Sequence, residues 1–486
     1  MPAVQACAGY PWSMASTTVC PRLLPRLRRR LRAWILAAGC ALASLPALGQ
    51  ALPAPGAPEL SPAHWIAAAP DAQALLLDPA QVQAHNARLR RDDASIIDLD
   101  ALPERLPGSR VRGWIQALSA PPRRTLHDQH GQPLAAAVLD GLQAALALDA
   151  LPATVRPRWG LVVRRSALRT FPTALRVFST TDDQDLDRFQ ESALFPGDAV
   201  ALLHASADGQ WLFVASERYR AWLRAADVAE GSRAEVLGYA RREPALVVTG
   251  AQVRTAHTPE AAELSSLLLD MGVRLPLLPH PGAQAAVNGQ SPLAAHLVQL
   301  PRRLEDGRLQ LAPALLPLAA DVHRGPLPLS RANLLTQAFK FLGERYGWGH
   351  DYQARDCSGF VSEVYRSFGL LLPRNTGDQA ASPALQALPL PPPGQAGARA
   401  RALAALEVGD LVFMPGHVML VVGQQDGGPW VIHDIHGGSW RAADGRLQRQ
   451  RLNGVVVTPL AALLAEDGTP YADLVTALRR VPRSAP

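Results

Sequence analysis

Cys357 is the residue of this 486-residue chain best suited to covalent chemistry. The other three cysteines, Cys7, Cys20 and Cys40, lie close to the N-terminus. Cys357 comes just before a helix-like segment, 361–368, so we expect its thiol at a helix N-terminus. Unpaired amides there favour the thiolate and lower the thiol pKa from about 8.5 toward neutrality. The sequence thus predicts a reactive nucleophile.

Two histidines supply the other groups that thiol chemistry requires. Acyl transfer by a thiol needs a base for its proton and a third group that orients this base. His417 begins a strand-like segment, and His433 lies in the next one, after a loop at 424–429. If these strands are antiparallel neighbours, His417 accepts the Cys357 proton and its far nitrogen donates to His433. The backbone amide of Cys357 is then the expected oxyanion donor.

Structural roles and metal binding are the alternatives to a catalytic role for these residues. A lone cysteine is usually a small core residue, and a histidine at a strand start is usually structural. A metal site formed by His417, His433 and His436 is another alternative, but no motif such as H-E-x-x-H accompanies them. We therefore expect catalysis without a metal or an organic cofactor.

The segments that position these residues fill the last third of the chain. Apolar residues at helical spacing predict a helix over 332–345, ahead of Cys357. A Pro- and Ala-rich stretch, 382–404, predicts an exposed loop. Strand-like segments follow at 409–413, 417–423, 430–435 and 454–458. A cysteine-bearing helix followed by an antiparallel sheet is the papain-like order, so we expect an α+β fold.

The preceding residues predict a helical region and then two small barrels. Asp78 and Pro79 have the types expected at a helix N-cap and first turn, within a mainly helical region, 50–155. Short β-rich segments broken by Gly, Asp and Pro come next and resemble bacterial SH3-like barrels. We expect a first barrel at 156–230, a second and divergent one at 231–325, and the catalytic domain at 326–480.

Residues 1–49 have the pattern of a signal peptide. Six arginines and no acidic residue accompany an apolar stretch at 33–48, and small residues follow it. The apolar stretch is shorter than the ~20 residues of a membrane span and contains Pro46. We expect a periplasmic or otherwise exported protein without stable membrane insertion after cleavage. Lipid attachment at Cys40 is the less favoured alternative.

The formal charge of +6 belongs almost entirely to that N-terminal segment. Without its six arginines the chain is close to neutral. A neutral protein has no bulk electrostatic attraction for nucleic acid, so we expect no nucleic-acid partner.

The residues around Cys357 resemble those of a known family. Tyr-Gly-Trp-Gly at 346–349 precedes Arg-Asp-Cys-Ser-Gly-Phe at 355–360, and Gly-Asp-Leu-Val-Phe, Gly-His-Val and Val-Ile-His follow in that order. This series resembles the NlpC family of papain-like cell-wall cysteine peptidases. It is most similar to the multidomain members that carry two bacterial SH3-like barrels. The resemblance covers most of the chain after residue 49 and is most specific over 329–436.

The resemblance implies an activity and a catalytic set. The implied reaction is hydrolysis of the γ-D-glutamyl–diaminopimelate bond in peptidoglycan stem peptides, through a thioester acyl-enzyme. Cys357 matches the nucleophile, His417 the base and His433 the third polar member of the triad. The implied partners are peptidoglycan and murein-derived peptides.

The resemblance also implies how the substrate is held. The positions that match pocket residues are Trp348, Asp356, Ser358 and Thr376. Asp356 and Ser358 match positions that receive the free amine of an N-terminal L-Ala, and a carboxylate suits an ammonium group. Tyr219 is a candidate for the barrel residue that closes one end of the cleft.

This sequence departs from the family at two positions and in a Pro-rich insertion before Gly409, and other functions use the same residues. His350 stands where the family often has a glycine, and Thr376 stands where serine is common. The alternatives are a cell-wall amidase or acyltransferase with the same thiol chemistry, and a murein-binding protein without catalysis. The intact set of Cys357, His417 and His433 argues against the last alternative.

Overall fold

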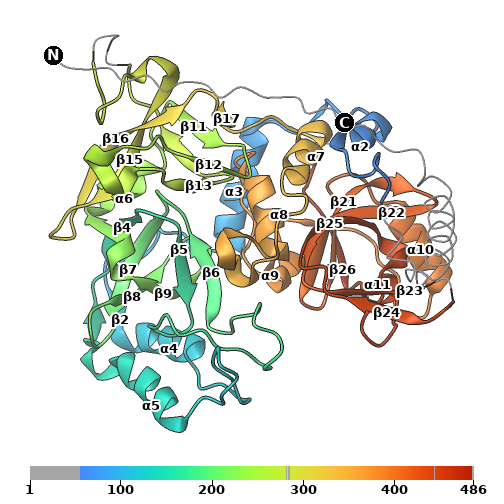
Figure 1. Cartoon of the computed structure of the whole chain (residues 1–486), viewed down its shortest axis with the longest axis horizontal. Coiled ribbons are helices and arrows are strands. Elements are labelled where there is room, and N and C mark those ends of the chain that lie inside the picture. Colours follow the sequence, from blue (N-terminus) through green and yellow to red (C-terminus); the bar gives the residue numbers. More distant parts are fainter. Residues whose placement is uncertain (1–54, 281, 283–284, 443, 484–486) are drawn as a thin grey trace, which may run out of the picture. The chain divides into compact units, whose positions relative to one another are not determined.

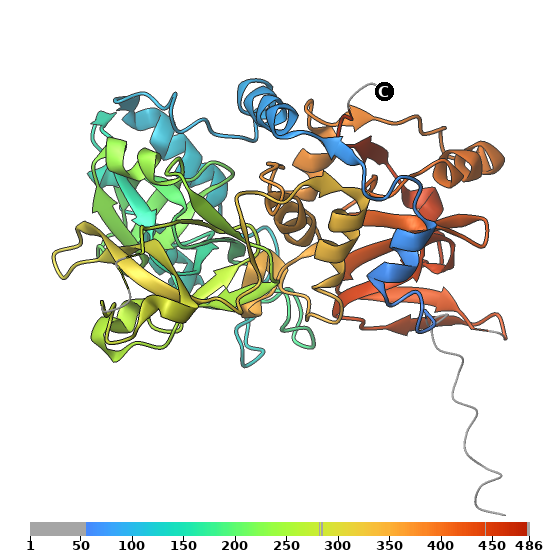
Figure 2. The same ribbon diagram turned by 90° about the horizontal axis from the view of Figure 1, so that it is seen from above.

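The computed structural model, drawn in two views in Figures 1 and 2, describes residues 55–280, 282, 285–442 and 444–483. The predicted signal peptide at 1–49 and its Cys40 lie outside these residues. No helix within the described ranges is both long and apolar enough to cross a membrane. Helices and antiparallel sheets occur together along the chain, which confirms the predicted α+β class.

The first described helix packs into the core of the C-terminal domain (329–481). Helix α2 (Pro62–Ala68) buries Trp65 against Trp430, with the two ring centroids 5.6 Å apart. Strand β1 (Leu75–Leu77) then pairs with β18 (Leu329–Ser330) in antiparallel orientation. These residues, which the sequence predicts to be part of a separate N-terminal region, therefore share a core with the C-terminal domain.

Helix α3 (Pro79–Asp92) begins at the N-cap that the sequence predicts. The Asp78 carboxylate accepts a hydrogen bond from the Gln81 N–H at 2.8 Å, and the Gln81 side chain accepts one from the Asp78 N–H at 2.8 Å. Helices α4 (Gly108–Leu118) and α5 (Ala136–Ala145) pack against the sheet that follows them. The N-terminal region is helical, but its helices are divided between two cores.

One seven-stranded antiparallel sheet forms the first β domain (154–231). Its strand order is β10-β4-β7-β8-β9-β5-β6. The strands are β4 (Arg158–Val162), β5 (Ser166–Arg169), β6 (Gln190–Leu194), β7 (Ala199–Ala205), β8 (Trp211–Ala215), β9 (Arg220–Arg224) and β10 (Val228–Gly231). The turn between β7 and β8 contains Gly209 at φ +69°, a left-handed conformation that favours glycine.

Three smaller antiparallel sheets form the second β domain (245–324) around one apolar core. The strands are β11 (Ala245–Val248), β12 (Gln252–Arg254), β13 (Leu268–Asp270), β14 (Arg274–Pro276), β15 (Ala295–Arg303), β16 (Leu309–Pro317) and β17 (Val322–Arg324). The long pair β15–β16 extends over nine residue pairs. The limits of the predicted second barrel, 231–325, remain a prediction.

A six-stranded antiparallel sheet is the centre of the C-terminal domain. Its order is β19-β26-β20-β21-β22-β25. The strands are β19 (Gln386–Ala387), β20 (Leu411–Met414), β21 (His417–Gln425), β22 (Gly428–Ile435), β25 (Gly454–Pro459) and β26 (Ala477–Arg480). Helices α7 (Arg331–Phe339) and α8 (Cys357–Arg366) cover one face, and α10 (Ala396–Ala404) and α11 (Tyr471–Leu474) cover the other (Figure 1).

The prediction of an exposed loop over 382–404 is wrong for its second half. Residues 396–404 form α10, because this stretch is rich in alanine, the strongest helix former. Arg399 is buried, and its guanidinium donates to the carbonyl oxygens of Pro391 at 2.7 Å and Val475 at 2.7 Å. These bonds hold the helix against the domain.

The buried Arg355 side chain joins the second β domain to the C-terminal domain. Its Nε donates to Glu363 at 2.6 Å, and its Nη1 donates to Glu344 at 2.7 and 2.8 Å. Its Nη2 donates at 2.9 Å both to Asp270 of β13 and to the carbonyl of Ala251. Burial alone would lower the pKa of Arg355, but the surrounding carboxylates raise that pKa above its usual value.

Replacing Arg355 by methionine is expected to destabilise the protein by about 3–5 kcal/mol, because buried carboxylates lose their counter-charge. Urea unfolding followed by tryptophan fluorescence measures this loss. The control is Arg446→Met, which removes a guanidinium that is 82% exposed and pairs with Asp444. It should change the stability by less than about 1 kcal/mol. Equally small losses in both variants would contradict this account of Arg355.

Candidate active site

Cys357 is the first residue of helix α8, and its thiol faces the start of strand β21. The side chain is buried, with 5% of its surface exposed. Its Sγ lies 3.6 Å from the Thr376 hydroxyl and 3.9 Å from the carbonyl oxygen of Gly416. His417 follows Gly416 directly and is the first residue of β21. The fold thus brings the thiol to the strand end that carries the predicted base.

His417, His433 and Thr458 form a chain of hydrogen bonds across three neighbouring strands. The Nε2 of His417 lies 2.8 Å from the Nδ1 of His433. The Nε2 of His433 lies 3.0 Å from the Thr458 hydroxyl. No hydrogen bond between described residues joins the Cys357 thiol to His417, so the Nδ1 of His417 remains available to accept a proton.

These hydrogen bonds fit the protonation that the predicted role of His417 as base requires. A proton on the Nε2 of His417 is donated to His433, which then carries its own proton on Nε2 and donates it to Thr458. The contact of Thr458 with His433 was not predicted from the sequence. Thr458 lies diagonally across from His433, whose direct partner in β25 is Val456. Only the pairing of β22 with β25 reveals this contact.

Burial disfavours the charged forms of the Cys357 thiol and of both imidazoles. Burial, with the Asp356 carboxylate in addition, raises the pKa of Cys357 to about 12. Burial lowers the pKa of His417 to about 4 and the pKa of His433 well below its usual value. The expectation of a lowered thiol pKa is therefore wrong. The first amides of α8 face a carboxylate, and low-dielectric surroundings disfavour a thiolate.

A buried ion pair between Asp356 and Arg374 holds the start of α8. The guanidinium donates to both carboxylate oxygens, at 3.1 and 2.8 Å, and Asp356 also caps α8 by accepting from the Gly359 N–H at 2.8 Å. Arg374 also donates to Ser192 of the first β domain at 2.7 Å. Burial alone would raise the pKa of Asp356, but Arg374 holds that pKa below its usual value. Arg374 was not predicted from the sequence, where its only distinction is that it lies two residues before Thr376.

The segment before Cys357 adopts a strained conformation that explains one departure from the family. In η6 (Trp348–Gln353), His350 has φ +66°, a value that favours glycine. His350 is held there by Glu363 at 2.8 Å from its Nε2 and by Arg374 at 2.9 Å from its Nδ1. Asp356 accepts from the Gly349 N–H at 3.1 Å and fixes the same turn. Buried hydrogen bonds thus offset the strain of a histidine at this position.

The predicted pocket residues lie around this ion pair. The Ser358 hydroxyl lies 3.0 Å from Arg374, and Thr376 contacts the thiol. The indole of Trp348 donates to the carbonyl of Gln190 in the first β domain at 3.1 Å. The structure therefore gathers all four predicted substrate-binding positions near the start of α8, while their roles remain a proposal.

The first β domain adds two polar residues to this region. The Tyr219 hydroxyl donates to the Glu191 carboxylate, and both belong to that domain. Burial, with the Glu191 charge in addition, raises the pKa of Tyr219 well above its usual value. Tyr219 also interacts electrostatically with Arg374 and Asp356.

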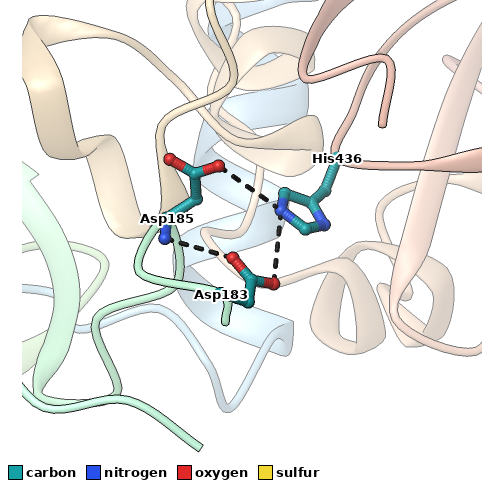
Figure 3. Close-up of side chains that lie close together, drawn as sticks. All are labelled: Asp183, Asp185 and His436. Atoms are coloured by element: carbon teal, nitrogen blue, oxygen red, sulfur yellow. Dashed lines mark hydrogen bonds and ion pairs between the residues drawn. The ribbon is translucent and has the colours of Figure 1, made fainter. Parts of the chain in front are cut away.

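A second cluster joins the first β domain to the end of β22 (Figure 3). The Nε2 of His436 lies 3.4 Å from Asp183 and 3.8 Å from Asp185. Asp185 also pairs with Arg345 at 2.5 Å, and Arg451 lies 3.9 Å from Asp183. Because arginines already balance these carboxylates, the cluster serves as a contact between the two domains.

The histidine triplet weighed as a metal site is not gathered at one point. Across the described part of the chain, the cluster in Figure 3 is the only group of three candidate ligands within mutual reach. It contains His436 but neither His417 nor His433. The predicted metal alternative therefore has no support from the positions of these residues.

Comparison with known proteins identifies two domains. Residues 343–456 match the NlpC/P60 family, and residues 176–224 match the SH3 domain of SH3b1 type. A curated relative, described as a probable endopeptidase p60 from Listeria welshimeri, is 35% identical over 120 residues. That match covers 22% of this chain, which spans only 20% of the length of the relative.

A solved structure has a similar fold over most of the chain. The NlpC/P60 endopeptidase from Photobacterium damselae subsp. piscicida matches with a TM-score of 0.67. The match covers 84% of this chain and 94% of that one, at 16% sequence identity. At this identity the likeness concerns the fold. Together with the domain matches, it confirms the family resemblance drawn from the residues around Cys357.

Alkylation of Cys357 by iodoacetamide is expected to be slow at neutral pH. Only the thiolate reacts, so a thiol whose pKa is raised to about 12 should react roughly tenfold faster per pH unit from pH 7 to 9. Peptide mapping by mass spectrometry locates the adduct, and the urea-unfolded chain supplies the unperturbed rate. Fast alkylation that is independent of pH down to about pH 5 would show a resting thiolate–imidazolium pair and contradict the neutral site.

Proposed function

Given the NlpC/P60 domain at residues 343–456, we propose that this chain is an exported cysteine endopeptidase acting on peptidoglycan. Its substrate is the stem peptide, and it cleaves the bond between γ-D-glutamate and diaminopimelate. The observation that carries the proposal is the position of the buried Cys357 thiol, which faces the start of β21. That strand begins with His417, which is hydrogen-bonded to His433. The SH3 domain at residues 176–224 supports a cell-wall substrate.

In the proposed reaction the acyl group passes through a thioester. Substrate binding displaces water, and the Sγ of Cys357 attacks the γ-carbonyl carbon while its proton moves to the Nδ1 of His417. The Cys357 N–H is among the first amides of α8, which lack an intrahelical acceptor, so it stabilises the oxyanion. The imidazolium then gives its proton to the departing amine of diaminopimelate.

Water completes the cycle. His417 removes a proton from water, whose oxygen attacks the thioester carbonyl, and the collapse of this intermediate releases the new carboxyl group. The sulfur recovers its proton from His417. His433 and Thr458 keep the Nδ1 of His417 directed to the reacting atoms through both steps. Because the pKa of His417 is lowered to about 4, this base stays unprotonated until the pH falls to that value.

The same region supports selection of a free N-terminal L-Ala. The substrate ammonium pairs with Asp356, which shares its carboxylate with Arg374, and with the hydroxyl of Ser358. Glu191, held by Tyr219, places a second carboxylate in the first β domain. Two carboxylates in this region would favour a charged amine over an acylated one.

Incubation with L-Ala-γ-D-Glu-diaminopimelate is expected to release L-Ala-γ-D-Glu, detected by liquid chromatography and mass spectrometry. Cys357→Ala should abolish this release, and N-acetylation of the substrate should lower kcat/KM by at least about 100-fold, since the ammonium contacts are lost. Unchanged turnover by Cys357→Ala would refute the thiol mechanism. Release of L-Ala alone would place cleavage at the L-Ala–D-Glu bond and contradict the proposed specificity, and binding without cleavage would indicate a murein-binding protein.

Thr458→Val is expected to lower kcat about fivefold with little change in KM, because a lost hydrogen bond of about 1 kcal/mol loosens the orientation of His433. Thr458→Ser keeps the hydroxyl and should restore most of the rate. Thr469→Val, at a threonine away from these residues, is the matched control. A Thr458→Val enzyme as fast as the control would exclude a positioning role for Thr458.

A further inference from the structure

A cavity of about 400 Å³ lies at the opposite end of α8 from Cys357. Arg366, the last residue of α8, lines it together with Arg218 of the first β domain and Arg274 of the second. Arg366 is nine positions after Cys357 in the same helix, which corresponds to about 13 Å along the helix axis. The cavity is therefore distinct from the candidate active site.

Basic residues outnumber acidic residues in the lining of this cavity. It contains five arginines and four acidic residues: Arg90, Arg218, Arg241, Arg274, Arg366, Asp98, Asp100, Asp198 and Glu217. Three of the acidic residues already have arginine partners: Glu217 pairs with Arg90 at 2.6 Å, Asp198 with Arg366 at 2.6 Å, and Asp100 with Arg241. Asp98 accepts only backbone N–H groups of Asp100 and Ala101.

Asp198 and Glu217 attract the charge of Arg218, but among the arginines that line the cavity it alone lacks an ion pair or hydrogen bond with a described residue. Arg218 is only partly exposed. Burial, with the charge of Arg366 in addition, lowers the pKa of Arg218 to about 10. Such a guanidinium keeps its charge at neutral pH but lacks the acceptors that an arginine of this kind normally has.

Two neighbouring guanidinium groups also have unused donors. The Nη1 atoms of Arg274 and Arg366 are buried and have no acceptor among the described residues. The Nη2 of Arg274 donates to Glu243 at 2.6 Å, and its Nη1 is the terminal nitrogen that lacks an acceptor. Buried donors without acceptors are costly, and an oxyanion in the cavity would satisfy them.

We propose that this cavity binds a small ligand through a carboxylate or phosphate group held by Arg218, with Arg274 and Arg366 as further donors. The planar guanidinium matches the spacing of two oxygens in either group. The volume admits a molecule larger than a single ion, such as a free amino acid or a short peptide. Asp98, the acidic residue without a cation, faces the same space and suits an amino group on the ligand.

Isothermal titration of the full chain tests this site with three probes at constant ionic strength: inorganic phosphate, free diaminopimelate and L-Ala-γ-D-Glu. We expect saturable binding of at least one probe, and Arg218→Gln should weaken it at least tenfold. Arg224→Gln removes an exposed arginine of the same domain that stacks on Trp211, and it should leave the affinity unchanged. Tighter binding of phosphate identifies a phosphate ligand, and tighter binding of either carboxylate probe identifies a murein-derived one.

Absence of saturable binding of all three probes would overturn the proposal, as would equal affinities of Arg218→Gln and Arg224→Gln. A thermal-unfolding series keeps the test independent of folding defects. The bound probe should raise the midpoint of the wild type and of Arg224→Gln but not that of Arg218→Gln. The same titration with Cys357→Ala should give the wild-type affinity, because the cavity does not include the thiol.

Discussion

The buried ion pair between Asp356 and Arg374 is the interaction on which the candidate active site depends. Asp356 fixes the strained η6 turn by accepting from the Gly349 N–H, and it caps α8 by accepting from the Gly359 N–H. Arg374 connects the same carboxylate to Ser192 of the first β domain. Removing either partner leaves an uncompensated buried charge, which costs about 3–5 kcal/mol. Cys357 directly follows Asp356, so this ion pair fixes the position of Cys357 at the start of α8.

A neutral resting site is the physical consequence of building the thiol and both histidines into the core. Burial disfavours the thiolate of Cys357 and the imidazolium of His417, so the proposed reaction requires charge separation to accompany substrate binding. The strand pairing β21–β22–β25 fixes His417, His433 and Thr458 in one line of hydrogen bonds. The orientation of the base is thus set by the sheet, and its protonation state is set by the surroundings.

The sequence predicted the local features of this protein better than the long-range ones. Asp78 indicated the start of α3. The residues around Cys357 indicated the start of α8, and His417 and His433 were predicted on neighbouring strands. Thr458 was not predicted because its partner lies on a neighbouring strand. Arg374 was not predicted because its partners are distant in the sequence: Asp356 precedes it by 18 residues, and Ser192 belongs to a different domain. The rise in the pKa of Cys357 was not predicted because burial is a property of the folded chain. The packing of Trp65 against Trp430 was not predicted because these residues are far apart in the sequence.

The contacts of the first β domain with Arg374 and Trp348 make it part of the site and not an appended module. The central claim is that the sulfur of Cys357 carries the acyl group during turnover. Rapid acid quenching of the wild-type protein with L-Ala-γ-D-Glu-diaminopimelate, followed by peptide mapping, tests it most directly. The account predicts a mass gain of one L-Ala-γ-D-glutamyl group on the peptide that contains Cys357. Product release with no adduct at Cys357, even at the earliest quench times, would contradict it.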